Sequence, residues 1–218
     1  LPVDEDFRLE QPGEVHALFF GLGADGTVGA NKNSIKIIAD GTELHAQGYF
    51  VYDSKKSGAI TVSHLRFGPR KIRSTYLIER DSAGFVACHQ PQFLEGVDML
   101  SYAAPGAVFL INTPTPPEEL WSSFSSEVQE QVQAKSLSVY CIDAYAVAAA
   151  AGLGKRINTI MQTCFFAISE VLPKDEAIEA IKAGVQKSYG RRGKRIIEKN
   201  YRAIDAALEG LHEVPLDS

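Results

Sequence analysis

The feature that most constrains the fold is a glycine-rich turn between an apolar run and a helical pattern. Residues 15–20 are mostly apolar, which is typical of a strand buried on both faces. The run ends in Gly21-Leu-Gly-Ala-Asp-Gly26, and a helical pattern over 27–39 follows and stops at Asp40-Gly41. A strand, a tight turn and a helix in this order predict the first unit of a parallel α/β sheet.

Apolar runs and helical patterns continue to alternate up to about residue 140. We expect further strands over 47–52, 60–67, 85–89, 107–112 and 137–142, and a short extended piece at 75–78. We expect helices over 93–102 and 118–135, then a helical C-terminal part over 144–151, 158–172, 175–188 and 194–211. This order predicts a three-layer α/β/α fold with a mostly parallel sheet. The short loop 53–58 favours an antiparallel hairpin, so we expect a mixed sheet.

Charge and cysteine content exclude several classes of protein. The 218 residues carry a formal net charge of −5, which disfavours general nucleic-acid binding. No stretch of about 18 uncharged apolar residues is present, so we expect no transmembrane helix and no membrane partner. The three cysteines, Cys88, Cys141 and Cys164, form no C-x-x-C motif, which argues against an iron–sulfur cluster or a zinc site. We expect buried, reduced thiols in a cytoplasmic protein.

The pattern Gly21-x-Gly23-x-x-Gly26 has the context of a phosphate-binding turn. Glycines let a ligand approach the backbone, and the N–H groups at a helix start attract anions. The same glycines could instead merely allow a tight turn. Asp25 argues against an ordinary dinucleotide site, because it would repel a pyrophosphate unless it points away. Lys55 and Lys56 follow the second strand and favour a ribose phosphate, which leaves NADP or coenzyme A, unless these lysines only form a solvated turn.

Several longer motifs resemble one family. They are Phe20-Gly-Leu-Gly-Ala-Asp-Gly-Thr-Val-Gly-Ala-Asn-Lys32, Gln47-Gly-Tyr-Phe-Val-Tyr-Asp-Ser-Lys-Lys-Ser-Gly58, Ser63-His-Leu-Arg-Phe-Gly68, Ala87-Cys-His-Gln-Pro-Gln-Phe93 and the run 154–163. In this order they are similar to the central, gamma-type domain (domain III) of single-chain pyruvate:ferredoxin (or flavodoxin) oxidoreductase. The resemblance spans residues 14–212. It implies a linker at 1–13, a coenzyme A-binding domain at 14–212 and an exit linker at 213–218, in a chain that was processed or cut from a longer one.

The resemblance also implies a division of labour. The family oxidises pyruvate with coenzyme A to acetyl-CoA and carbon dioxide, and passes electrons through [4Fe-4S] clusters to ferredoxin or flavodoxin. Thiamine diphosphate, magnesium and the clusters would lie in other domains, so this chain would hold no catalytic residue and no metal. Its partners would be the other domains of a homodimeric enzyme. Its role would be to bind coenzyme A and present the thiol to the thiamine-bound intermediate.

The coenzyme contacts that the resemblance implies fall on a small set of positions. The turn N–H groups and the Thr27 hydroxyl would hold phosphate oxygens, a lysine would pair with a phosphate, and two asparagines would bind ribose, amide or adenine groups. The positions are Gly23, Ala24, Asp25, Gly26, Thr27, Lys55, Lys56, Asn158 and Asn200.

Two other readings of the chain stay open. It could be an NADP-dependent reductase built on the same turn, or a purely structural domain of a larger enzyme. A basic block over 182–202 could attract the coenzyme or dock a neighbouring domain, or it could be a solvated helix face. His16, His64 and His89 are too far apart in sequence to predict a metal site, and we expect each to be structural.

Overall fold

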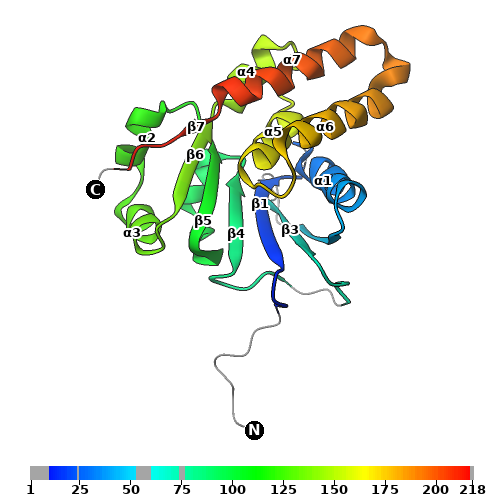
Figure 1. Cartoon of the computed structure of the whole chain (residues 1–218). Coiled ribbons are helices and arrows are strands. Elements are labelled where there is room, and N and C mark those ends of the chain that lie inside the picture. The colour runs from blue at the N-terminus through cyan, green and yellow to red at the C-terminus, as the bar shows by residue number, and fades with distance from the viewer. Residues whose placement is uncertain (1–9, 24, 53–59, 74–76, 217–218) are drawn as a thin grey trace.

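A seven-stranded mixed sheet with helices on both faces forms the body of the chain (Figure 1). The computed structural model describes residues 10–23, 25–52, 60–73 and 77–216. The strand order is β2-β3-β1-β4-β5-β6-β7. The strands are β1 (Val15–Leu22), β2 (His45–Tyr52), β3 (Ile60–Gly68), β4 (Ala83–Cys88), β5 (Ala103–Asn112), β6 (Ser138–Ile142) and β7 (His212–Glu213).

Five of these strands run in one direction, which confirms the mostly parallel, mixed sheet. β1, β4, β5 and β6 pair in parallel, whereas β3 lies antiparallel between β1 and β2. The antiparallel pairing of β2 with β3 confirms the expected hairpin. β7 was not expected: it pairs antiparallel with β6, and the buried Val214 donates its N–H to the Val139 carbonyl. The segment expected as an exit linker, 213–218, therefore begins inside the sheet.

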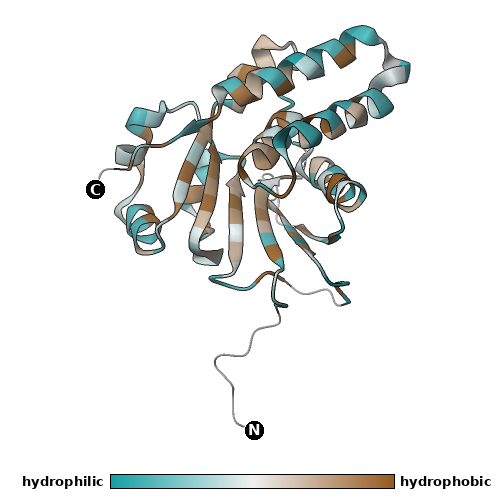
Figure 2. Cartoon of the chain, viewed as in Figure 1, coloured by the Kyte–Doolittle hydropathy of each residue, from teal (hydrophilic) through white to brown (hydrophobic). Residues whose placement is uncertain are grey.

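The helices divide between the two faces of the sheet. One face carries α1 (Thr27–Gly41), α4 (Ala144–Ala150), α5 (Asn158–Ile168), α6 (Lys174–Tyr189) and α7 (Lys194–Gly210). The other carries α2 (Pro117–Ser123), α3 (Ser126–Ala134) and the 3-10 turns η1 (Pro91–Glu95) and η2 (Leu100–Tyr102), and a third turn, η3 (Gly190–Arg192), joins α6 to α7. Figure 2 shows why both layers are needed, since the central strands are largely hydrophobic. On β1, Ala17 and Phe19 pack under α5, whereas Leu18 and Phe20 pack into the opposite layer.

Two predicted helices differ from the structure. The expected helix 118–135 is two helices, because the Ser125 hydroxyl accepts the Val128 N–H and starts a new helix there. The expected helix 93–102 is replaced by η1 and η2, and η1 ends at Gly96. Of the extended piece 75–78, residues 74–76 lie outside the described part of the chain, and Leu77 and Ile78 form no strand. None of the helices described here is long and apolar enough to cross a membrane.

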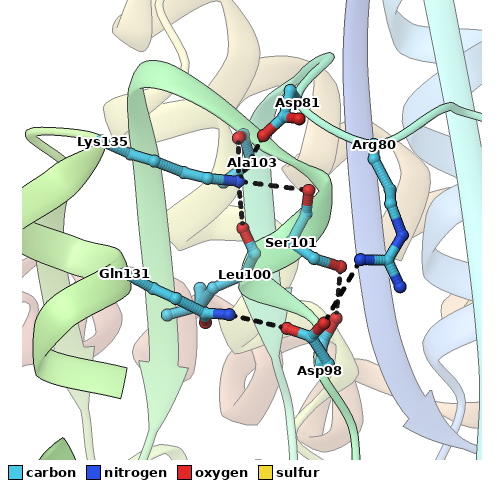
Figure 3. A network of polar contacts seen from close by, with 8 residues as sticks. All are labelled: Arg80, Asp81, Asp98, Leu100, Ser101, Ala103, Gln131 and Lys135. Carbon is cyan, nitrogen blue, oxygen red and sulfur yellow. Dashed lines mark hydrogen bonds and ion pairs between the residues drawn. The ribbon is translucent and has the colours of Figure 1, made fainter. Parts of the chain in front are cut away.

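Lys135 joins α3 to the start of β5 (Figure 3). Its ammonium group donates to the carbonyls of Leu100 (2.8 Å), Ser101 (3.1 Å) and Ala103 (2.8 Å). It also forms an ion pair with Asp81 at 2.7 Å. The Lys135 side chain is mostly buried, so water has little access to these carbonyls. Removal of the ammonium would therefore leave the carbonyls without a hydrogen-bond donor.

Replacing Lys135 with methionine should therefore lower the free energy of unfolding by about 2 kcal/mol, because the stem is kept while the three carbonyls lose their donor. Urea denaturation measures this change. The control, Lys71→Met on an exposed loop, should change stability by less than about 0.5 kcal/mol. Equal stability of both variants would contradict the role given to Lys135.

Candidate functional site

The glycine turn lies between β1 and β4, the two neighbouring strands whose following connections lead to opposite sides of the sheet. From the carboxyl end of β1, α1 leads to β2 beyond β3, whereas the chain after β4 leads to β5 on the other side. The carboxyl ends of β1 and β4 lie side by side, and the His89 N–H donates to the Phe20 carbonyl at 2.9 Å. Such a switch point is where open α/β sheets place their ligands.

Asp25 points into the turn and holds it together. Its carboxylate accepts the N–H of Leu22 at 2.7 Å and the N–H of Thr27 at 2.9 Å. It also accepts the hydroxyl of Thr27. The family resemblance implies that the Thr27 N–H and hydroxyl hold phosphate oxygens. In the structure both donate to Asp25, so a phosphate can use them only if Asp25 turns away.

Packing explains two of the three glycines. A Cβ on Gly21 would lie 2.4 Å from the Thr27 Oγ1, and Thr27 is buried. Gly26 has a φ of +86° and lies against Asn158, where a Cβ would be 3.1 Å from the Asn158 Cγ. Among the described residues, a Cβ on Gly23 would meet only the Thr61 Oγ1, at an ordinary 3.6 Å. Gly21 and Gly26 are therefore required by the turn itself, and Gly23 is the one of the three glycines that the described residues do not crowd.

His89 lies behind the turn and completes a chain of hydrogen bonds that sequence reasoning missed. Its Nδ1 lies 2.8 Å from the Thr27 Oγ1. A carboxylate only accepts, so the Thr27 hydroxyl donates to Asp25 and the His89 Nδ1–H donates to Thr27. Burial lowers the pKa of His89 from 6.5 to about 4, although the Asp25 charge opposes this shift. The ring is therefore neutral near pH 7, and its Nε2 is a buried acceptor with no hydrogen-bond partner among the described residues.

The structure brings together some of the predicted site residues. Asn158, the first residue of α5, contacts Gly26, and Gln162 on the same helix donates to the Ala30 carbonyl (3.1 Å) and the Ser34 hydroxyl (3.0 Å) of α1. Asn200 is buried in α7, and its side-chain amide donates to the Ile196 carbonyl of the same helix. Ala24, Lys55 and Lys56 lie outside the described residues.

The three cysteines lack the features of reactive thiols. All three cysteines are free and buried, and burial raises the pKa of Cys88 and Cys164 to about 12 and that of Cys141 to about 11. Such thiols stay protonated and unreactive at neutral pH. Among the residues that the structure describes, no group of three or more His, Cys, Asp and Glu side chains is arranged to hold a metal ion.

The fold and the turn define the class of domain: a three-layer α/β domain with a glycine-rich turn at the switch point of the sheet. Residues 16–210 match the family model described as pyruvate ferredoxin/flavodoxin oxidoreductase, and the chain belongs to this family. It is 57% identical over 214 residues to a putative pyruvate-flavodoxin oxidoreductase of Synechocystis, covering 98% of this chain and 18% of that protein. It is 49% identical to the pyruvate:ferredoxin oxidoreductase of Moorella thermoacetica, with the same coverage. The chain thus spans about a fifth of the length of these relatives.

Solved structures share the fold at low sequence identity. The pyruvate oxidoreductase subunit PORC of Thermotoga maritima superposes with a TM-score of 0.70 and 15% identity, covering 93% of this chain and 99% of that one. A second solved structure is the 2-oxoglutarate:ferredoxin oxidoreductase from Magnetococcus marinus, with 2-oxoglutarate, coenzyme A and succinyl-CoA bound. It superposes with a TM-score of 0.65 and 16% identity, covering 91% of this chain and 31% of that one. The fold of this chain therefore occurs both as a separate subunit and as part of longer chains.

The buried histidines should make the chain less stable in acid. Unfolded histidine binds a proton below about pH 6.5, whereas His89 and His64, the latter buried and beside Arg66, stay neutral down to about pH 4. Unfolding thus takes up protons, and the free energy of unfolding should fall between pH 6.5 and 4, by on the order of 2 kcal/mol for each histidine.

Urea denaturation across this range checks the expectation. His89→Gln should reduce the acid-dependent loss, since one of the two buried rings is gone, and His64→Gln should do the same. His45 is exposed, and His45→Gln should leave the pH dependence unchanged. A wild-type chain of equal stability at pH 6.5 and 4 would contradict the assignment of neutral, buried rings.

Proposed function

We propose that this chain is the coenzyme A-binding domain of a 2-oxoacid:ferredoxin or flavodoxin oxidoreductase, with pyruvate as the oxoacid. The domain would bind coenzyme A at the switch point and present its thiol to an intermediate on thiamine diphosphate held by other domains. Magnesium and the [4Fe-4S] clusters would also lie in those domains. The observation that carries the proposal is family membership over nearly the whole chain, together with Gly23, which the described residues do not crowd, at the switch point of the sheet.

The described residues offer groups for the neutral parts of the coenzyme. Asn158 carries an amide that can both donate to and accept from ribose hydroxyls or amide groups. It lies against Gly26, at the carboxyl edge of the sheet where ligands of such folds bind. In this proposal Asn158 orients the coenzyme, and the turn fixes the distance between the coenzyme and the sheet.

One observation favours a second candidate, a purely structural domain. The donors of Thr27 are taken by Asp25, and packing alone explains Gly21 and Gly26. A turn closed in this way could serve only to connect β1 to α1. The two candidates differ in whether the intact protein loses ligand affinity when Asn158 is changed.

Calorimetry on the intact protein that carries this chain separates these functions. Coenzyme A should bind at micromolar affinity and NADPH should not. Asn158→Ala should weaken coenzyme A about tenfold, as expected for the loss of one or two buried hydrogen bonds. Gln133→Ala, on the exposed side of α3, should bind like the wild type.

The contrary results are equally distinct. Binding of NADPH without coenzyme A would support a reductase. No effect of Asn158→Ala on coenzyme A affinity would place the ligand elsewhere in the protein and leave this chain with a structural role.

A further inference from the structure

The hairpin of α6 and α7 ends in a concentrated positive charge. We define its tip as Lys187–Arg195, which includes η3. The tip holds five basic residues and no acidic one: Lys187, Arg191, Arg192, Lys194 and Arg195. In Figure 1 the hairpin reaches outward from the rest of the molecule, with the tip at its far end. The side chains of Lys187, Arg191, Lys194 and Arg195 are exposed.

The packing of the hairpin does not use these charges. Deeper in the hairpin, Lys182 forms an ion pair with Asp205 at 3.2 Å and lies over the ring of Tyr201. Within the described part of the chain, Lys187, Arg191, Lys194 and Arg195 form no ion pair. Like charges this close repel one another, and Glu198, the acid nearest to them in sequence, forms none of the ion pairs recorded among the described residues. A bound anion would compensate these charges.

The tip lies at the same end of the helical layer as the glycine turn. Leu172, just before α6, contacts Gly41 at the end of α1, and Gly184 near the end of α6 contacts Asn33. The two helices therefore run antiparallel, so the carboxyl end of α6 points toward the end at which α1 begins. Thr27 lies about 9 Å along α1 from Asn33, and Gly190 lies about 9 Å beyond Gly184 along the direction of α6. The start of α1 and the tip therefore lie at the same level along the two helices. Asn158 marks the same end, because it contacts Gly26.

The turn itself cannot supply the charge that phosphates need. Asp25 is the anion inside it, and the Thr27 N–H and hydroxyl are bonded to that carboxylate. Coenzyme A is a polyanion, so its phosphates require cations; Lys55 and Lys56, which the sequence predicts for this role, lie outside the described residues. The tip provides further cations at the correct end of the layer, and α7 also begins there with the positive end of its helix dipole.

We propose that the tip of the α6–α7 hairpin binds the phosphate groups of coenzyme A, while the glycine turn and Asn158 contact its uncharged parts. This inference rests on the proposed function, since it divides one ligand between two parts of the same site. The tip acts through charge and geometry and takes no part in bond making.

Two triple variants of the intact protein test this division. The tip variant is Arg191→Ala, Lys194→Ala, Arg195→Ala. Its control is Arg70→Ala, Lys71→Ala, Arg73→Ala, which removes the same three residue types from an exposed loop after β3, at the opposite edge of the sheet. Both change the net charge equally, so a long-range effect of charge would appear in both. Circular dichroism and melting temperature confirm that each variant is folded.

Calorimetric titration with coenzyme A should give affinity about tenfold or more weaker for the tip variant and within about twofold of the wild type for the control. Affinity of the wild type should fall as the salt concentration rises, and that dependence should be shallower in the tip variant. Equal affinities of the two variants would overturn the inference while leaving the proposed function intact. A wild type that does not bind coenzyme A would overturn both.

Discussion

The carboxylate of Asp25 is the interaction on which the site depends. It binds the end of β1 through the Leu22 N–H and the start of α1 through the N–H and hydroxyl of Thr27. The neutral ring of His89, at the end of β4, supports Thr27 from behind. Only four residues separate the end of β1 from the start of α1, because one side chain satisfies donors on both sides of the turn. Burial keeps the His89 ring neutral, and the Thr27 hydroxyl, which donates to Asp25, fixes the ring proton on Nδ1, so the arrangement also depends on the core around it.

Local patterns predicted most of the fold. The apolar run of β1, the glycine turn and the pattern of α1 identify a βα unit, and the short loop after residue 52 predicts the pairing of β2 with β3. The misses have local causes that composition does not reveal. Ser125 caps a new helix inside an apparently continuous pattern, and β7 is two residues long and is recognisable only from its pairing with β6.

The candidate site was harder to predict because its contacts join distant parts of the chain. His89 meets Thr27 across 62 residues, and Asn158 meets Gly26 across 132 positions. No spacing rule finds such pairs. Asn158 was predicted by resemblance to a family and not by its surroundings, whereas His89 was expected to be only structural. Its place directly after a strand, at the carboxyl edge of the sheet, was the available signal.

Hydrogen–deuterium exchange of the intact protein, with and without coenzyme A, tests the central claim that the coenzyme binds across the turn and the hairpin tip. We predict slower exchange in peptides covering residues 21–31 and 187–196, and unchanged exchange in the loop 77–82 at the opposite edge of the sheet. Unchanged exchange in both site peptides, at a coenzyme concentration that saturates the protein, would contradict the account.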